Sequence, residues 1–216
     1  MKNANIGPLL SALKGIPTVW DGKKSILEMK EANFRWKDLE WIGFYFEFIC
    51  YKTLSDMMKF HTVKYGSVSF DGFFTVPLDF KTHVINSESH QIITNDTQAT
   101  ISAISEYGCV IDVIALGEAE YNDVNRTFQK WHEKLKGGKS EYERERIRRG
   151  ALSRLRKTKF TLNEIMIVRM TKETLQKSGS FQTGFRNADG SPRNSKVLLN
   201  LEKLSPSEII GIIKFR

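Results

Sequence analysis

The chain has 216 residues, of which 40% are hydrophobic and 27% are charged. This composition supports a folded domain with its own core and excludes a chain that is disordered by composition. The formal net charge of +8 at pH 7 favours a polyanionic partner such as nucleic acid, with a merely basic globular protein as the alternative.

The positions of the cysteines and of the apolar runs indicate the cellular compartment. Cys50 and Cys109 both lie inside apolar runs, which predicts buried thiols and neither a disulfide nor a zinc site. Lys14 and Pro17 interrupt the region where a signal peptide would need its apolar core. No apolar run approaches the roughly 18 residues that span a bilayer. We therefore expect a cytoplasmic protein without a membrane partner.

The first half of the chain is predicted to run from helix to strand pair to helix. Ser25 with Glu28 matches a capping box, which predicts a short helix directly after Ser25. The helix that follows is apolar nearly all round, as is typical of a helix buried against a sheet. In chain order we predict a docking arm over 1–24, helices over 26–34 and 37–59, strands over 66–74 and 78–86, a polar loop over 87–95 and a helix over 96–107.

The second half begins with the strongest strand pattern. Residues 109–116 are an almost continuous β-branched run, typical of a central strand covered on both faces. The periodicity of 209–215 leaves a helix and a strand equally open. The other predicted elements are helices over 119–136 and 139–157 and strands over 160–170 and 196–201. The order of elements predicts an α/β fold in which a central mixed β-sheet is flanked by helices.

Charged residues that could act in catalysis gather in the hairpin predicted for the strands 66–74 and 78–86. Asp71 ends one apolar run, and Asp79 and Lys81 follow in the next. Because side chains alternate along a strand, Asp79 and Lys81 share one face while Leu78 and Phe80 point to the other. Folding the hairpin back brings Asp71 towards Asp79. Two carboxylates and one ammonium at a common edge suit metal-assisted hydrolysis of a phosphodiester, with carboxylate oxygens holding Mg²⁺.

This pattern resembles the PD-(D/E)XK nuclease superfamily, whose best-known members are type II restriction endonucleases. The resemblance rests on Asp71, seven intervening residues and Asp79-Phe80-Lys81, and it covers chiefly residues 40–116. No proline precedes Asp71, where the pattern's name would place one. The resemblance implies a restriction-endonuclease-like core, in which helices flank the sheet and the acids lie on two adjacent central strands.

The resemblance also implies an activity. The expected enzyme is a Mg²⁺-dependent, sequence-specific endonuclease of double-stranded DNA, a type II restriction enzyme that leaves 5′-phosphate and 3′-hydroxyl ends and in which Mn²⁺ can replace Mg²⁺. Asp71 and Asp79 would ligate the metal, the carbonyl of Phe80 would add an oxygen ligand, and Lys81 would contact the scissile phosphate and the attacking water. One small chain with one site implies a homodimer on a palindrome, and a DNA methyltransferase is the expected companion of such an enzyme.

In this interpretation residues 1–216 form a single nuclease domain, with the catalytic core over about 37–117 and DNA-contacting elements over about 139–200. Glu47 lies in the most apolar part of the predicted helix 37–59, where an uncompensated carboxylate is costly. The resemblance implies that Glu47 joins the site and binds the metal through water or helps hold a second ion. A carboxylate that is simply paired with an arginine or a backbone amide is the alternative.

Two segments are predicted to contact DNA. Residues 139–159 hold nine cations and three acids, a net charge of +6, and the cations of the later half have no acidic neighbours in the sequence. The loop 177–196 is rich in arginine, asparagine and glutamine, which read base edges, although an ordinary surface loop fits it equally well. The candidate DNA-binding residues are Arg148, Arg149, Arg154, Arg156, Lys157, Arg186 and Arg193.

Two other functions remain open at this stage. A repair, recombination or mobile-element nuclease of the same fold would recognise DNA structure in place of a short sequence. A non-catalytic basic nucleic-acid-binding protein would use the same acids structurally, with Asp71-Gly72 as turn residues and Asp79 and Lys81 on the wet face of a strand.

Overall fold

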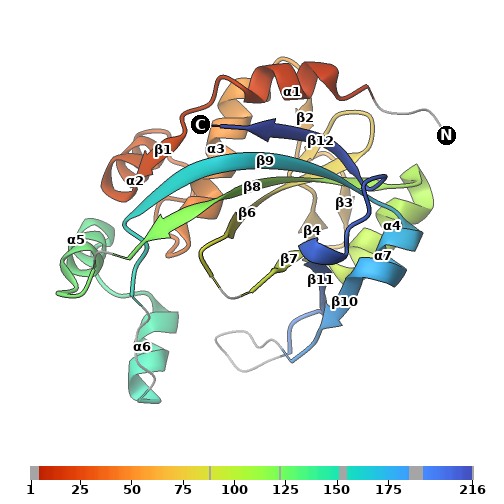
Figure 1. Ribbon diagram of the computed structural model, residues 1–216. Helices are drawn as coiled ribbons and strands as arrows, with labels where there is room; N and C mark the ends of the chain where they lie inside the picture. The colour runs from red at the N-terminus through yellow and green to blue at the C-terminus, as the bar shows by residue number, and fades with distance from the viewer. Residues whose placement is uncertain (1–4, 88, 122, 151–154, 185–191, 216) are drawn as a thin grey trace.

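A curved, mixed β-sheet forms the centre of the computed structural model, which describes residues 5–87, 89–121, 123–150, 155–184 and 192–215 (Figure 1). Its strands are β1 (Val19–Asp21), β2 (Lys59–Phe60), β5 (Gly72–Phe73), β6 (Pro77–Val84), β8 (Val110–Glu120), β9 (Lys159–Met170) and β12 (Ile209–Lys214). They lie in the order β1-β9-β8-β6-β5-β2, and β12 also pairs with β9. Since β6 and β8 are parallel and the other pairs are antiparallel, the prediction of a mixed sheet is confirmed.

The parallel pair is joined by a crossover through strand β7 (Gln91–Asp96) and helix α4 (Thr97–Tyr107). Asp96 caps this helix, because its side chain accepts a hydrogen bond from the backbone of Ala99. Gly108 ends the helix in the left-handed conformation, with φ of 83°, which glycine adopts without steric cost. These two signals fix the helix close to the range that the sequence predicts.

Helix α3 (Trp41–Leu54) covers one face of the sheet. Its side chains Phe46 and Tyr51 meet the ring of Phe80 edge-on, and Leu78 is buried in the same core. Because side chains alternate along β6, Asp79 and Lys81 point to the opposite face. The nearly all-apolar sequence of α3 is explained by this position, in which nine of its residues are buried.

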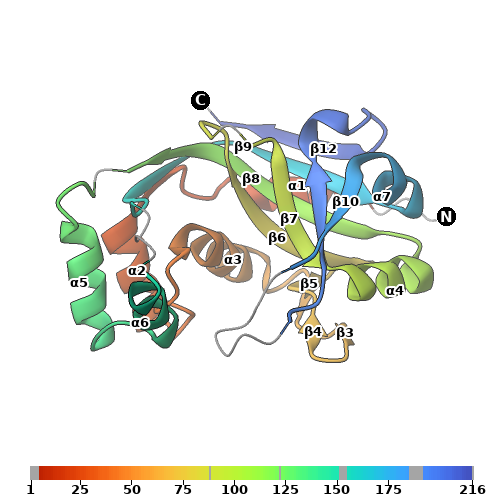
Figure 2. The same ribbon diagram turned by 90° about the horizontal axis from the view of Figure 1, so that it is seen from below.

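The opposite face is covered by α4 and by a smaller antiparallel sheet, which consists of β10 (Gly179–Gln182), β11 (Lys196–Asn200) and β7 in the order β10-β11-β7. Ile114 and Leu116 of β8 pack against Ile92 and Leu199 of this smaller sheet. Figure 1 shows it below the central sheet, and Figure 2 views it from below. The even-numbered residues of β8 and the odd-numbered residues of β6 therefore face this second layer.

The remaining elements frame these layers: α1 (Gly7–Leu13), α2 (Gly22–Glu31), β3 (Lys64–Tyr65), β4 (Val68–Ser69), α5 (Thr127–Lys136), α6 (Glu141–Arg148), α7 (Lys172–Ser178) and a 3₁₀ turn, η1 (Leu201–Lys203). Helix α1 lies along β12 (Figure 1), where Leu10 is next to Gly211. Leu9 and Leu13 are fully buried, so the N-terminal arm belongs to the core. In the described part of the chain, no helix combines the length and the apolar content that crossing a bilayer requires.

Several sequence predictions need correction. Helix α2 begins at Gly22 with Asp21 as its cap, and not after Ser25, because Ser25 is buried and Glu28 accepts a hydrogen bond from Tyr45. The region 87–95, predicted as a loop, contains most of strand β7, in which Ile92 and Thr94 are buried and Gln91 and Ile93 are exposed. The segment 209–215, for which the sequence left helix and strand open, forms strand β12 over Ile209–Lys214.

Other boundaries differ for a shared reason, namely that strands continue as far as a neighbour pairs with them. Strand β8 extends to Glu120 because β9 pairs along its whole length, and the predicted helix 119–136 therefore begins only at Thr127. The predicted strand 66–74 is reduced to the short β4 and β5. Among the described residues of the predicted helix 139–157, the helix is α6, and residues 151–154 lie outside the described part. The loop 177–196 starts within α7 and contains β10.

Gly117 marks a β-bulge between β8 and β9. A Cβ atom there would lie 2.2 Å from the Thr161 carbonyl oxygen and 2.5 Å from the ring of Phe160. We expect Gly117→Ala to destabilise the fold by about 1–3 kcal/mol through overpacking, measured as a lower Tm. Gly15→Ala, whose nearest atom would be 3.7 Å away, is the control. Equal melting of the two variants would contradict the close approach at Gly117.

Candidate active site

Asp71 and Asp79 are held together by backbone hydrogen bonds. The Asp71 amide donates to Oδ1 of Asp79 at 3.2 Å, and the Phe80 amide donates to Oδ2 of Asp71 at 2.8 Å. These bonds form because β5, which follows Asp71, pairs with the start of β6. The predicted approach of Asp71 to Asp79 across the hairpin is therefore confirmed.

Lys81 completes this cluster. Its Nζ lies 3.3 Å from Oδ2 of Asp79 and 3.8 Å from Oδ2 of Asp71. Burial acts to lower the pKa of Lys81, but the negative charges of Asp79, Asp71 and Asp112 outweigh it, and the pKa lies above its ordinary value. The sequence leaves the direction of this shift undecided. In the folded chain Lys81 is a permanent ammonium at neutral pH.

A residue that the sequence analysis missed, Asp112, lies beside Asp79. The two occupy paired positions on the parallel strands β6 and β8, and each is only 2% exposed. Burial first, and then the charge of Asp79, raise the pKa of Asp112 to about 8. Burial likewise raises the pKa of Asp79 to about 6, against the attraction of Lys81. In the sequence, Asp112 is recognisable only as the single acid in the β-branched run 109–116. The register of β6 and β8 is what places it beside Asp79.

Asp71 occupies the more open side of the cluster, with 18% of its side chain exposed. Burial raises its pKa, whereas Lys81 and the Phe80 amide lower it. Lys81 is similarly open, at 21%. Solvent therefore reaches the cluster from the side of Asp71 and Lys81, while Asp79 and Asp112 form its buried floor.

Glu47 reaches the cluster from α3, on the other face of the sheet. Its Oε1 accepts a hydrogen bond of 2.8 Å from the Tyr51 hydroxyl, which also contacts Nε2 of His61. The His61 amide in turn donates to the Asp71 carbonyl. Burial raises the pKa of Glu47, and the Tyr51 hydrogen bond and the charge of Arg35 oppose the shift. Glu47 is thus linked to Asp71 through Tyr51 and His61 and interacts with Asp79 and Lys81 through its charge.

The donor atoms of the cluster fit Mg²⁺ in their chemistry, since they are carboxylate and carbonyl oxygens. Oδ2 of Asp112 is buried and accepts no hydrogen bond from the described residues, whereas Oδ2 of the buried Asp79 has the Lys81 ammonium at 3.3 Å. The Phe80 amide points towards Asp71, and in a strand the carbonyl of the same residue points to the same side. Among the described residues, no group of three or more histidine, cysteine, aspartate and glutamate side chains is arranged as a metal site. Mg²⁺ commonly uses only one or two protein carboxylates and completes its shell with water and phosphate, so Asp71 and Asp79 suffice as protein ligands.

The predicted phosphate-contacting segment has acidic partners that the sequence did not reveal. Arg156 donates to Oε1 of Glu143 at 2.8 Å, and Lys136 donates to Oε2 of the same carboxylate at 3.2 Å. Glu143 is 4% exposed, so these two cations neutralise the charge of a buried acid. Lys157 pairs with Glu40 at 2.8 Å. Arg156 and Lys157 have no acidic neighbours in the sequence, and the fold supplies their partners from α6 and from the start of α3.

The other candidate cations differ in their surroundings. Arg148 and Arg149 both pair with Glu145 of their own helix, and both remain exposed. Arg193 lies next to β11 and is exposed. Two further candidates, Arg154 and Arg186, lie outside the described residues. Contact of any of these residues with DNA remains a prediction.

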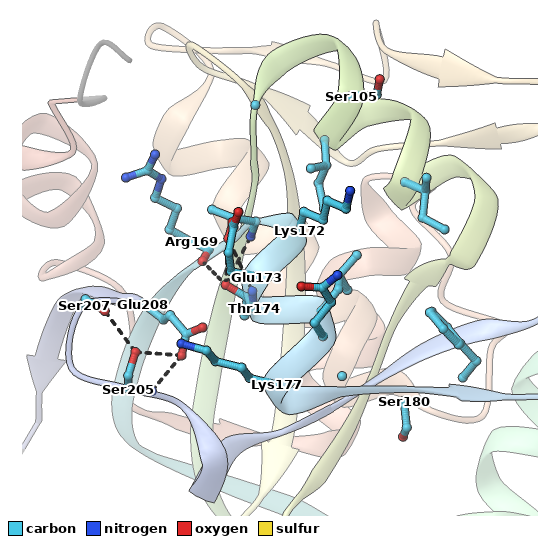
Figure 3. A pocket seen from close by; sticks show the side chains of 18 residues that line it. Ser105, Arg169, Lys172, Glu173, Thr174, Lys177, Ser180, Ser205, Ser207 and Glu208 are labelled. Carbon is cyan, nitrogen blue, oxygen red and sulfur yellow. Dashed lines mark hydrogen bonds between the residues drawn. The ribbon is translucent and has the colours of Figure 1, made fainter.

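A hollow of about 1170 Å³ lies away from the cluster, between α4, α7, β10 and the turn before β12 (Figure 3). Lys172 and Lys177 line it, together with Glu208, which is held by the amide and the hydroxyl of Ser205 at 2.7 and 2.9 Å. None of the acids of the cluster lines this hollow. It is a separate surface feature and does not extend the candidate active site.

Comparison with known proteins adds no relative: no protein-family model, no curated protein and no solved structure matches the chain. The evidence for the site therefore consists of its geometry and of the motif in the sequence.

Asp112 makes stability depend on pH in the metal-free protein. A carboxyl whose pKa is higher in the folded than in the unfolded chain stabilises the fold at low pH, and this contribution is lost as the pH rises through the folded value, here about 8. We expect the Tm of the wild type in EDTA to fall between pH 5 and pH 9, and Asp112→Asn to fall less and to melt several degrees higher at pH 9. Thermal melts of the wild type, of Asp112→Asn and of the control Asp56→Asn, which changes an exposed acid, test this. An unchanged slope in Asp112→Asn would contradict the burial of its charge.

The pairing of Arg156 predicts a structural role. Arg156→Gln leaves Oε1 of the buried Glu143 without its donor and should destabilise the fold by about 2 kcal/mol. Arg148→Gln removes an exposed ion pair and should change stability by less than about 0.5 kcal/mol. Urea unfolding of both variants provides the measurement, and equal midpoints would refute the difference between the two arginines.

Proposed function

We propose that the protein is a Mg²⁺-dependent endonuclease of double-stranded DNA with a restriction-endonuclease-like fold. One observation carries the proposal, namely that Asp71, Asp79 and Lys81 converge at the edge of the β5–β6 hairpin, where backbone amides hold the two carboxylates. Surface acids on a wet strand face would show neither this convergence nor the burial of Asp79.

The topology around these residues supports the proposal. Helix α3 precedes the hairpin, the acids lie at β5 and β6, and the crossover helix α4 leads to the parallel strand β8. Asp71 stands directly before the two-residue strand β5, and Asp79 lies on β6. The implied core would place the two acids on adjacent central strands of a sheet flanked by helices. The net charge of +8 suits a polyanionic substrate.

The side chains have distinct roles in this proposal. Asp71, Asp79 and the Phe80 carbonyl would hold Mg²⁺, which when bound neutralises phosphate charge and lowers the pKa of water. Lys81, protonated at neutral pH, contacts a non-bridging oxygen of the scissile phosphate and orients the attacking water. The water oxygen forms the new bond to phosphorus and gives up a proton to the surrounding solvent, while the bond to the 3′ oxygen breaks and that oxygen takes up a proton from solvent. The products are a 5′-phosphate and a 3′-hydroxyl.

Glu47 has a supporting role. The Tyr51 hydroxyl fixes one of its oxygens, and its charge acts on Asp79 and Lys81. This agrees with binding the metal through water more than with direct ligation, because α3 approaches from the opposite face of the sheet. Asp112 lies behind Asp79, and because its pKa is raised to about 8 it adds little negative charge at neutral pH in the metal-free protein.

The biological role that we propose is that of a type II restriction enzyme in the cytoplasm, which acts as a homodimer on a palindrome and has a companion methyltransferase. A homodimer brings two copies of the single cluster to the two strands of the duplex. Mn²⁺ is expected to support cleavage as well, since it prefers the same oxygen ligands.

Cleavage of unmethylated plasmid and phage DNA in Mg²⁺ tests the proposal. The wild type should give discrete fragments, and Asp79→Asn and Lys81→Gln should each lose at least about a thousandfold in rate, since each removes charge at the reacting phosphate. Asp56→Asn and Lys214→Gln make the same chemical changes at exposed positions and serve as matched controls.

The remaining outcomes separate the alternative functions. Nicking that depends on branches or mismatches, lost in the same two variants, would favour a repair or mobile-element nuclease. Intact DNA in Mg²⁺ and in Mn²⁺, with binding retained, would refute the catalytic proposal and favour a binding protein.

A further inference from the structure

Glu47, the acid of α3, depends on one hydrogen-bond donor among the residues that the structure describes. Its Oε1 accepts a hydrogen bond of 2.8 Å from the Tyr51 hydroxyl, and Oε2 accepts none from the described residues. Glu47 is 8% exposed, and a carboxylate at this depth is costly without a partner. The position of the Tyr51 hydroxyl therefore decides how Glu47 is oriented.

The ring of Tyr51 is held by aromatic neighbours on several sides. The ring centroid of Phe60 lies 4.3 Å away, and the rings of Phe34 and His61 each meet Tyr51 edge-on at 5.3 Å. Tyr51 stands four residues after Glu47 on α3, so the two side chains share one face of the helix. These contacts restrict the ring, and the hydroxyl is thereby fixed between Glu47 and Nε2 of His61.

The two hydrogen bonds of the Tyr51 hydroxyl must run in one direction. A phenol hydroxyl carries a single hydrogen, and in Tyr51 this hydrogen is donated to Glu47. The contact with His61 therefore requires a proton on Nε2 of the imidazole, which donates to the Tyr51 oxygen. Burial and the charge of Glu47 raise the pKa of Tyr51, so the hydroxyl keeps its proton at neutral pH. The chain of donors runs from His61 through Tyr51 to Glu47.

The backbone of His61 connects this chain to Asp71. His61 follows β2 directly, Asp71 precedes β5 directly, and Phe60 of β2 pairs with Gly72 of β5. The His61 amide extends this pairing by donating to the Asp71 carbonyl at 3.2 Å. His61 has a φ of 51°, in the left-handed region that residues other than glycine seldom adopt. Its side chain is exposed, so burial in the core does not explain this conformation, and strained residues of this kind cluster at functional sites.

We propose that Tyr51 and His61 are positioning residues of the active site, which hold Glu47 by Oε1 and leave Oε2 to accept a hydrogen bond from a water molecule of the Mg²⁺ shell. Groups that orient the ligands of a metal in this way commonly contribute about 10–100-fold to metal affinity. Because His61 is bonded to Asp71 as well as to Tyr51, it also sets the acid of α3 relative to the acid of the hairpin. The inference rests on the proposed function for the metal, whereas the hydrogen bonds exist in the metal-free protein.

The direction of the hydrogen bonds is tested in EDTA, without metal or DNA. NMR of protein with ¹⁵N-labelled histidine, at about pH 8.5, distinguishes the two tautomers of the imidazole, and His61→Ala assigns the signals. We expect His61 to carry its proton on Nε2 in the wild type and to populate both tautomers in Tyr51→Phe. Tyr65→Phe, which removes a hydroxyl that donates to the exposed Glu106 at 2.7 Å, should leave His61 unchanged. A proton on Nδ1 alone in the wild type would overturn the inference.

Metal affinity tests the positioning role itself. Mn²⁺ is titrated into the metal-free protein, and the free ion is measured by electron paramagnetic resonance. Tyr51→Phe and His61→Ala should each weaken Mn²⁺ binding at least about tenfold. His61→Gln, whose side-chain amide can replace the Nε2 donor, should recover most of the loss. His90→Ala, which changes an exposed histidine beside Glu202, is the control and should match the wild type.

The outcomes separate this inference from the proposed function. Thermal melts establish that each variant is folded. A wild type that cleaves DNA, together with Tyr51→Phe and His61→Ala variants that bind Mn²⁺ as tightly as the wild type, would leave the proposed function standing and overturn the positioning role. A wild type that binds Mn²⁺ but cleaves no DNA would refute the proposed function, while weaker binding in the two variants would still support the positioning of Glu47. A wild type that binds no Mn²⁺ would overturn both.

Discussion

The ammonium of Lys81, 3.3 Å from Asp79 and 3.8 Å from Asp71, is the interaction on which the site depends. Three acids are brought together on neighbouring strands, and the two on the floor are almost fully buried. Without a cation, burial and mutual repulsion would favour their protonated forms. Lys81 favours the charged forms of Asp71 and Asp79, and the carboxylates in return keep Lys81 protonated. Each partner sets the charge state of the other, so substitution of either one alters the whole cluster.

The two faces of the sheet differ in polarity. Helix α3 covers one face with apolar side chains. Its one acid is Glu47, which accepts a hydrogen bond from the Tyr51 hydroxyl. The other face stays polar around Asp79, Asp112 and Lys81, because α4 and the smaller sheet cover the apolar residues on either side of them. The alternation of side chains along β6 and β8 makes both arrangements possible on the same two strands.

Charge on the rest of the molecule has two different uses. In the segment 139–159 most cations pair with acids, and Arg156 and Lys136 satisfy the buried Glu143 that also closes the capping box of α6. These residues hold α5 and α6 in place. Arg148 and Arg149, by contrast, pair with Glu145 at the surface and remain exposed. A count of charges along the chain does not distinguish these uses, since the partners are distant in sequence.

The sequence by itself determined the local features of this protein. Alternation along 77–84 assigned Asp79 and Lys81 to one face, the turn before it brought Asp71 close, and all-round apolarity identified α3, because each of these depends on residues a few positions apart. Only the tertiary structure decided the rest. The parallel register of β6 with β8 placed Asp112 beside Asp79, pairing with β11 made a strand of the polar segment that forms β7, and pairing with β9 made a strand of the tail. Register, strand partners and ion pairs join residues far apart in the chain, and no local periodicity records them.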